Sequence, residues 1–388
     1  MKFRSFMFEG IFMSKNDQLK LSIINDFIYR RITRPEAAQL LDTTERTVTR
    51  MANKIRRQGI AGIKHGNSGK TPANKTSSTL LSKAIQKYEK DYFDMNVTHA
   101  LEYLHKDEEF KNLKYEVFRH KLKSKGLVKR KKRRLSVKRN LRVRSSSEGY
   151  ILQMDGSHHK WNRKDEWCLI AAIDDATSDI PYGEFFLSED TLNCMTVIQR
   201  IIEKKGIPMA IYVDKAGWFG GLKRQQFSHF KTACEELGIK VIFANSPQAK
   251  GRVERAWDTF QDRIIPEMRL RNIHSITAAN YYLQKEFIPN YWAKNNTVVA
   301  RDLEPKYRPI PGHIDLNEIF CLKEQRQVKS DHTISWNGIH YHVKTNLLYA
   351  IHKQSIEIRT YQDLTSKAFF AGKEVHLTKV EELLKQTA

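Results

Sequence analysis

Cysteine is scarce in this sequence, and its few copies lie far apart. The 388 residues include four cysteines, and none of them forms a Cys-x-x-Cys pair. This spacing argues against a zinc site of closely spaced cysteines and against a disulfide framework. Three of the cysteines lie inside apolar segments predicted as strands or helices, where buried thiols are common. Such usage fits a reducing cytoplasm.

The sequence also lacks a long apolar run. Phe6–Met13 is apolar, but it is short and interrupted by Glu9. It is a poor signal peptide and too short to span a bilayer. Met13 could be the natural start, which would make residues 1–12 an unstructured extension. We therefore expect no membrane association.

Acidic residues are few in the first 150 positions, which carry 35 Lys and Arg against 15 Asp and Glu. The whole chain has a net charge of +23, so the remaining residues contribute only +3. A charge this concentrated predicts phosphate binding. A membrane surface is a poorer partner, because no basic amphipathic helix with a large apolar face stands out.

Residues 14–62 have the pattern of a helix-turn-helix DNA-binding domain. Leu19–Tyr29 is apolar at helical spacing, and Thr33–Glu36 is a capping box before a short helix, Ala37–Leu41. A second cap at Asp42–Glu45 begins a helix that should run to about Arg57. That helix would present to DNA the side chains of Arg46, Thr47, Thr49, Arg50 and Lys54. The alternative is a small helical hairpin with a solvated charged face.

Residues 78–128 form a second helical segment, which also resembles a helix-turn-helix domain. Within it, Tyr115–Leu127 is similar to another recognition helix, rich in Lys and Arg. A basic linker, residues 129–146, follows and includes Lys131, Lys132, Arg133 and Arg134. A flexible basic linker beside DNA-binding domains would follow a phosphate backbone, and a solvated disordered spacer is the alternative.

From Tyr150 onward, strands alternate with helices. The predicted elements are strands Tyr150–Asp155, Trp167–Ile173 and Ile180–Phe186, helix Thr191–Lys204, strand Ala210–Asp214, helix Lys223–Leu237, strand Lys240–Phe243 and a helix from Gly251. This order, βββαβαβα, matches a ribonuclease-H-like α/β unit over residues 147–298.

Residues 310–376 contain four or five short strands, including a hairpin with an Asn337-Gly338 turn, and predict a small β-barrel. Thr378–Lys385 is expected to be a short helix, and the fold class is multidomain α+β.

Three acidic residues lie where such a unit binds ligands. Asp155 is predicted to end the first strand, where Gly156 would let the chain turn sharply and leave room for a ligand. Asp214 ends another apolar strand, and ligands of open α/β sheets bind at strand carboxyl ends. Glu254 lies about 100° around its helix from the apolar stripe that begins at Val253, so it can lean into a cleft.

Three carboxylates held close together repel one another, and a bound cation relieves the repulsion. Ligand sets made only of oxygen favour Mg²⁺ or Mn²⁺ over zinc. Two such ions can activate a water and stabilise a leaving oxygen in phosphodiester cleavage. Asp155, Asp214 and Glu254 are therefore the predicted metal ligands and catalytic residues. The alternative is that each is an ordinary strand-end or helix-surface acid.

Residues 150–295 resemble the catalytic core shared by retroviral integrases and many bacterial insertion-sequence transposases. The motifs that carry this resemblance are Asp155-Gly156-Ser157 with His159 and Trp161, Ile173–Ser178, Glu189 with Thr191, and Ser246–Arg255. They are similar to one group of insertion sequences long left outside the main families. The Asp, Asp and Glu of that group fall on Asp155, Asp214 and Glu254. The resemblance covers about residues 20–380.

The chain also departs from this pattern. Retroviral integrases have an N-terminal His-His-Cys-Cys zinc site, whereas no cysteine precedes Cys168 here. Two positions often occupied by Lys in integrases are Asp258 and Gln261. Contacts to the element end are then expected from Lys250, Arg252, Arg255, His158, His159 or Trp161. For His159, a hydrogen-bonded strand-end histidine is an equal alternative.

The sequence thus predicts a DNA transposase that binds the terminal inverted repeats of its element, cleaves there and joins the 3′-hydroxyl ends to target DNA. Its expected partners are double-stranded DNA and further copies of itself, because two ends must be handled together in a dimer or larger synaptic assembly. We expect it in the bacterial cytoplasm, associated with the nucleoid. A transposase-derived regulator without catalysis, or a ribonuclease-H-like nuclease without strand transfer, are the alternatives.

Overall fold

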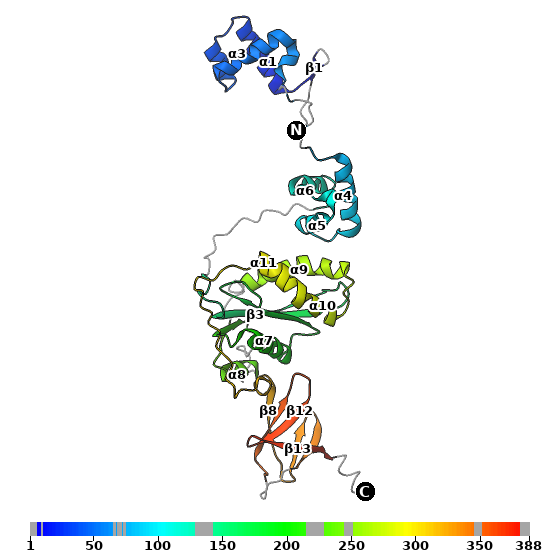
Figure 1. Cartoon of the computed structure of the whole chain (residues 1–388), viewed down its shortest axis with the longest axis vertical. Coiled ribbons are helices and arrows are strands. Elements are labelled where there is room, and N and C mark those ends of the chain that lie inside the picture. Colours follow the sequence, from blue (N-terminus) through cyan, green and yellow to red (C-terminus); the bar gives the residue numbers. More distant parts are fainter. Residues whose placement is uncertain are drawn as a thin grey trace. The chain divides into compact units, whose positions relative to one another are not determined.

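The computed structural model describes residues 6–8, 11–64, 67, 72, 75–128, 143–214, 229–243, 251–344 and 351–380 (Figure 1). It divides into two compact units, Met1–Ser77 and Ser78–Ala388. Several groups of residues singled out from the sequence lie outside the described residues. They are the basic run Lys131–Arg134, most of the linker around it, the start of the helix expected at Lys223, the motif residues Ser246–Lys250 and the end of the helix expected to reach Lys385.

The described part of the first unit is mainly helical. Its elements are β1 (Phe6–Phe8), β2 (Ile11–Met13), α1 (Lys15–Ile28), α2 (Arg34–Leu40), α3 (Glu45–Gln58) and the 3-10 helix η1 (Gly59–Ile63). The predicted capping box is present, with Thr33 and Glu36 each bonding the other's backbone at the start of α2. Thr44 caps α3 by accepting a hydrogen bond from the backbone of Thr47. Val48 and Ala52 of α3 are buried against Ile24 of α1, which fixes the face that α3 turns inward.

The expectation that residues 1–12 form an unstructured extension is wrong for the residues that the structure describes. β1 pairs antiparallel with β2, with Phe6 opposite Met13 and Phe8 opposite Ile11. The apolar residues of this short segment therefore pair with each other. Met13 is buried in the core of the first unit, so it belongs to the fold of that unit.

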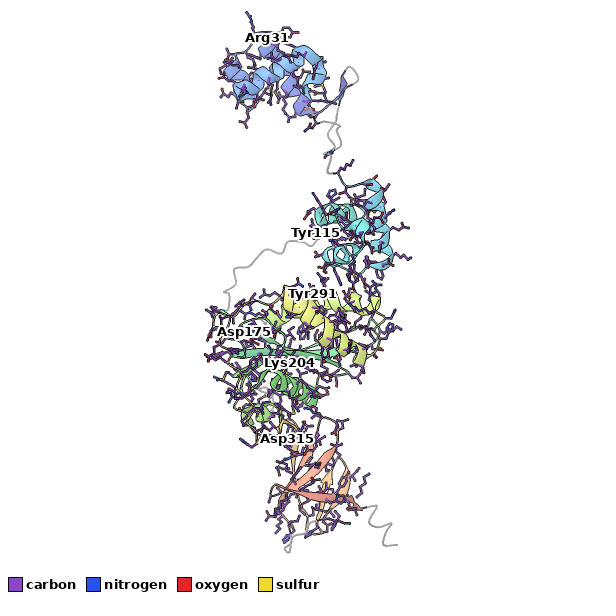
Figure 2. The ribbon with its side chains drawn as sticks, in the orientation of Figure 1. Arg31, Tyr115, Asp175, Lys204, Tyr291 and Asp315 are labelled. Atoms are coloured by element: carbon purple, nitrogen blue, oxygen red, sulfur yellow. The ribbon has the colours of Figure 1, made fainter. Side chains whose placement is uncertain are left out.

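The second unit begins with another helical segment. Its elements are α4 (Ser78–Asp91), α5 (Val97–Leu104), the 3-10 helix η2 (Glu108–Phe110) and α6 (Tyr115–Ser124). Ile85, Leu104 and Phe118, one from each of α4, α5 and α6, are fully or almost fully buried in a shared core. Figure 2 labels Tyr115 at the start of α6.

A mixed sheet follows, and its order along the sheet is β5-β4-β3-β6-β7. The elements of this region are β3 (Ile151–His159), β4 (Trp167–Asp174), β5 (Tyr182–Phe186), α7 (Thr191–Lys205), β6 (Ala210–Val213), α8 (His229–Glu236), β7 (Lys240–Phe243), α9 (Gly251–Leu270), α10 (Ile276–Tyr282), the π-helix η5 (Leu283–Trp292) and α11 (Ala293–Asn295). β4 pairs antiparallel with β3 and with β5, whereas β6 pairs parallel with β3 and with β7. The predicted order of strands and helices is present.

Helices cover both faces of this sheet (Figure 1). α7 and α8 pack on one face, where Ile198 and Phe230 share a core with Met154 and Ile170 of the sheet. α9, α10 and η5 pack on the other face, where Phe260 and Trp292 share a core with Leu169 and Ile173. β4 is buried along its whole length, as expected of a strand covered on both sides.

Polar side chains join the α4–α6 segment to α9. Glu267 of α9 lies 2.8 Å from Nε2 of His99 and accepts a hydrogen bond of 2.6 Å from the hydroxyl of Tyr103. Arg263 donates to both carboxylate oxygens of Glu102, and Arg269 donates two hydrogen bonds to Asp94. Burial raises the pKa of Glu267, but the hydrogen bonds from His99, Tyr103 and Arg271 outweigh it and hold that pKa at about 2.

The C-terminal strands form a nearly closed sheet. After the short helix α12 (Leu316–Ile319), the strands are β8 (Leu322–Gln327), β9 (Thr333–Trp336), β10 (Ile339–Lys344), β11 (Ser355–Thr360), β12 (Ser366–Phe370) and β13 (Lys373–Lys379). Their order is β8-β11-β12-β13-β10-β9, and the two end strands contact each other. Asn337 and Gly338 both have positive φ, as the predicted type I′ turn requires.

The expected helix Thr378–Lys385 is contradicted where it is described. Thr378 and Lys379 belong to β13 and pair with His342 and Tyr341 of β10. Strand pairing therefore continues past the point where the apolar pattern alone favoured a helix. None of the described helices is long and apolar enough to cross a membrane.

Candidate active site

Asp155 and Asp214 come from neighbouring parallel strands and are level with each other. Ile151, Leu152 and Gln153 of β3 pair with Ala210, Ile211 and Tyr212 of β6. Counting on by two residues from the Gln153–Tyr212 pair places Asp155 level with Asp214, one residue beyond the end of β6. Because strand side chains alternate between faces, these two residues also share a face.

That face is the one covered by α9. Asp155 is paired with Ala171, whose side chain belongs to the core under α9. The indole N–H of Trp257 donates a hydrogen bond of 3.0 Å to Asp155. Glu254 is exposed and lies three residues before Trp257, about one turn nearer the start of α9. The three predicted acids thus lie on the same face of the sheet.

The prediction that Asp155 ends its strand is wrong. β3 continues to His159 and pairs with β4 throughout, with Gly156 opposite Ile170. Gly156 therefore makes no turn. Its missing side chain instead gives space to Glu189, because a Cβ atom at Gly156 would lie 2.4 Å from the Glu189 carboxylate.

Glu189 is the residue near the acids to which sequence reasoning assigned no role. It lies between β5 and α7, and its side chain is only 11% exposed. Burial raises the pKa of Glu189, and the nearby charges of Asp155 and Asp214 raise it further. His158 partly opposes this shift. The carboxyl group of Glu189 is therefore close enough to both Asp155 and Asp214 for their charges to act on it.

Two other acids at the end of β4 are already held by hydrogen bonds. Asp174 accepts bonds from the backbone N–H groups of Gly149, Ala176 and Thr177, although burial still raises its pKa. Asp175, labelled in Figure 2, accepts from Gln153 and forms an ion pair with Arg252 of α9. This buried pair ties the start of α9 to β4, close to Glu254 along the helix.

Comparison with known proteins identifies the family. A protein of Sinorhizobium fredii (strain NBRC 101917 / NGR234) named as a transposase, y4bF, is 31% identical over 84% of this chain and 72% of the relative. The transposase for insertion sequence IS1202 of Streptococcus pneumoniae is 26% identical over 83% of this chain and 77% of the relative. The chain belongs to the transposases of insertion sequences. No family model matches it.

Solved structures of retroviral integrases are also similar to this chain. The HTLV-2 integrase catalytic core domain in complex with magnesium, in its trimeric form, has a TM-score of 0.30 at 19% identity and covers 39% of this chain and 95% of that one. The simian T-cell lymphotropic virus intasome in complex with PP2A regulatory subunit B56 gamma has a TM-score of 0.31 at 15% identity. It covers 62% of this chain and 82% of that one.

The residues of this transposase predicted to read DNA on α3 differ in how they are held. Arg46 and Arg50 are exposed and lie one turn apart. The hydroxyl of Thr47 lies 2.9 Å from that of Thr44, and the hydroxyl of Thr49 donates to the carbonyl of Glu45. Lys54 donates to the backbone carbonyl of Lys64. Arg46 and Arg50 are thus the more exposed of these side chains.

The predicted DNA contacts near the acids also differ in exposure. Arg255 is exposed on α9, whereas Arg252 is largely buried by its pairing with Asp175. His159 is half-buried, with its ring centre 5.7 Å from that of Trp161. Gln261 donates a hydrogen bond of 3.3 Å to Ser157, which joins α9 to β3 at a position often Lys in integrases.

Proposed function

We propose that this chain is a DNA transposase that binds the terminal inverted repeats of an insertion sequence, cleaves DNA at the element ends and joins the 3′-hydroxyl ends to target DNA. The observation that carries the proposal is the alignment of Asp155 with Asp214 under the helix that carries Glu254. Cleavage and joining are both in-line displacements at phosphorus, so one site can serve both steps.

The residues at this site fit divalent cations. The Asp155, Asp214 and Glu254 side chains offer only oxygen ligands, which suit Mg²⁺ or Mn²⁺. Burial and the nearby charges of Asp155 and Asp214 raise the pKa of Glu189, and a cation bound among these carboxyl groups would favour their charged forms. Two ions held by these three acids would supply an activated water and a stabilised leaving oxygen.

Neighbouring side chains would hold Asp155 and Glu254 in place. The Trp257 N–H fixes the orientation of the Asp155 carboxylate. The Arg252–Asp175 pair anchors the first turn of α9, where Glu254 lies. Because α9 is also buried along its Val253 and Phe260 stripe, Glu254 is presented from a rigid element.

The helical segments would deliver the element ends. We assign residues 14–62 and 78–128 as helix-turn-helix DNA-binding domains, with α3 and α6 as their recognition helices, and residues 147–298 as a ribonuclease-H-like core. The basic linker, residues 129–146, would follow the phosphate backbone, and residues 310–376 would form a small barrel. A dimer or larger assembly would hold two ends together, on chromosomal DNA in the bacterial cytoplasm.

The test is to incubate the chain with Mg²⁺, labelled DNA that carries the element end, and a supercoiled target. The proposal predicts both end cleavage and labelled products joined to the target. Binding without any cleavage would instead identify a regulator that lacks catalysis. Cleavage with no joined product would identify a nuclease without strand transfer.

A further inference from the structure

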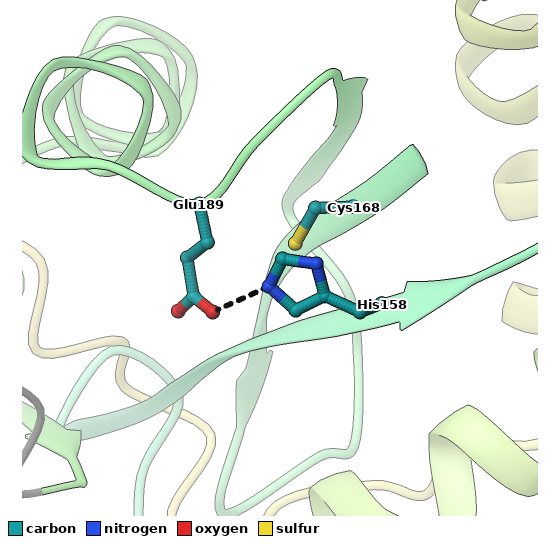
Figure 3. A group of neighbouring side chains, drawn as sticks. All are labelled: His158, Cys168 and Glu189. Carbon is teal, nitrogen blue, oxygen red and sulfur yellow. Dashed lines mark ion pairs between the residues drawn. The ribbon is translucent and has the colours of Figure 1, made fainter. Parts of the chain in front are cut away.

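Three side chains of different chemistry meet on the reverse face of the strand that carries Asp155. His158 of β3 is directly opposite Cys168 of β4 in the strand register. Glu189 reaches the same place from the segment before α7, and its carboxylate lies 3.4 Å from Nε2 of His158 (Figure 3). The His158 nitrogen, the Cys168 sulfur and a Glu189 oxygen all lie within 4.8 Å of one another.

This cluster lies on the other face of β3 from the Asp155 side chain, although Glu189 is close enough for the charges of Asp155 and Asp214 to raise its pKa. Asp155 faces α9, and the alternation of side chains along β3 puts Gly156 and His158 on the opposite face. Cys168 accordingly belongs to the core under α7, not to the core under α9. The two groups of side chains are therefore on opposite sides of one strand.

One nitrogen, one sulfur and one carboxylate oxygen are the donors that zinc binds in proteins. In a tetrahedral site with bonds of about 2.0–2.3 Å, neighbouring ligand atoms are roughly 3.3–3.6 Å apart. Nε2 of His158 and the nearer Glu189 oxygen are already 3.4 Å apart. Small side-chain rotations would bring the Cys168 sulfur to a similar distance from both atoms. His158 is about half exposed, which leaves a path for an ion and a place for water as a fourth ligand.

The surroundings favour a cation here. Gly156 leaves the space into which Glu189 fits, and the charges of Asp155 and Asp214 are close enough to raise the pKa of this nearly buried carboxyl group. Burial raises the pKa of Cys168 to about 12, so the thiol keeps its proton until a metal displaces it. Mg²⁺, which prefers oxygen ligands, is a poor match for this donor set.

We propose that His158, Cys168 and Glu189 form a second metal site, which binds Zn²⁺ or a similar borderline divalent cation in addition to any ions at the carboxylate site. Binding forms a metal–thiolate bond and releases the Cys168 proton to solvent. The site is a property of the folded chain alone and needs neither DNA nor catalysis.

The experiment titrates the full chain with Co²⁺, as a spectroscopic stand-in for Zn²⁺, in the presence of excess Mg²⁺ and without DNA. We expect one equivalent to bind with a sulfur-to-cobalt charge-transfer band, which Zn²⁺ then displaces. Cys168→Ser should abolish the band. His158→Ala removes a ligand and should weaken Co²⁺ binding by at least about 100-fold, because losing even a residue that only supports a ligand costs up to that much.

His158→Ala changes a half-exposed side chain, so it tests the site even where Cys168→Ser fails to fold. Cys321→Ser is the matched control, because Cys321 is also a buried thiol but lies outside the cluster. It should keep the band. The absence of a thiolate band in the unaltered chain, or a band that survives both Cys168→Ser and His158→Ala, would overturn the proposal. A failure of DNA cleavage would leave it untouched, because binding is measured without DNA.

Discussion

At the scale of single residues, the candidate site depends on how the acids are held. The pairing of β6 with β3 ends before it reaches the level of Asp155, so the sheet holds this residue less firmly on that side. The hydrogen bond from Trp257 supplies the orientation that strand pairing does not. Groups that orient a metal ligand typically matter nearly as much as the ligand itself.

Trp257→Phe tests this orientation. The ring still fills the core, but the N–H that binds Asp155 is removed. We expect DNA joining to slow by about 10–100-fold and to require more Mg²⁺. The measurement is the rate of joining against Mg²⁺ concentration.

Trp292→Phe is the matched control for this change. Trp292 is buried in the same core and donates its N–H to the carbonyl of Ser178, away from the acids. It should cost stability and leave the Mg²⁺ dependence unchanged. Equal Mg²⁺ dependence in both variants would show that Trp257 is only a core residue.

The positions of Asp214 and Glu254 could be predicted from the sequence, but the side chains that surround them could not. Asp214 follows a short apolar strand, and Glu254 follows the start of an amphipathic helix, so local pattern identifies both positions. The sequence predicts a turn at Gly156 because the residues around a glycine do not show whether it lies within a strand or at the end of one. Glu189 meets Gly156 only through the tertiary fold. A glycine inside an otherwise regular strand was the available signal.

At the scale of elements, α3 is the first unit's candidate for reading DNA. Its Val48 face is buried, and Arg46 and Arg50 lie on its exposed side. Replacing both arginines with Ala should weaken binding to the element end by about 1–3 kcal/mol for each base that an arginine no longer reads. Fluorescence anisotropy with cognate and random DNA measures the change.

Lys15→Ala with Lys20→Ala, on α1, removes the same charge from a different helix and is the control. It should reduce affinity for both DNAs equally, as a general reduction of positive charge does. If the α3 variant behaves in the same way as this control, α3 is not the recognition helix and α6 becomes the main candidate.

The polar junction between α5 and α9 predicts an acid-sensitive contact. The pKa of Glu267 is about 2 in the folded chain, below the ordinary value of a glutamate. A depressed carboxyl pKa stabilises the fold above about pH 4.5, and that stabilisation is lost as pH falls toward 2. The size of this contribution is about 3 kcal/mol.

Glu267→Gln should therefore destabilise the second unit at pH 7 and flatten its loss of stability between pH 4.5 and 2. Urea unfolding at a series of pH values measures both effects. Glu116→Gln is the control, because Glu116 of α6 pairs with Arg119 on an exposed surface. If the two variants show the same pH profile, Glu267 does not stabilise the junction between α5 and α9.

At the scale of the whole molecule, positive charge is concentrated before residue 150. The run Lys131–Arg134 lies outside the described residues, so its role is a prediction from sequence. Changing these four residues to Gln should flatten the slope of log affinity against log salt by up to about 3–4, for cognate and random DNA alike. An unchanged slope would mean that the run is a solvated spacer.

Features of the fold that depend on neighbouring residues in the sequence could be predicted, whereas contacts between residues far apart in the chain could not. The order of strands and helices in the sheet, the Thr33–Glu36 cap and the Asn337-Gly338 turn depend on short stretches of sequence, and they are present. The junction between α5 and α9 could not be foreseen, because His99 and Glu267 are far apart in the chain and each has the pattern of an ordinary helix residue. The pairing of β1 with β2 was missed because the segment is very short.

We propose that Asp155, Asp214 and Glu254 act together as one metal-dependent site. The most direct test is to change each of these acids separately. Asp155→Asn, Asp214→Asn and Glu254→Gln keep the shape of each side chain and remove its charge. The measurement is cleavage and joining of element-end DNA in Mg²⁺, alongside end binding by the same preparations. All three variants should lose both reactions and bind the ends nearly as well as the unaltered chain. Joining at the unaltered rate by any one of them would contradict it.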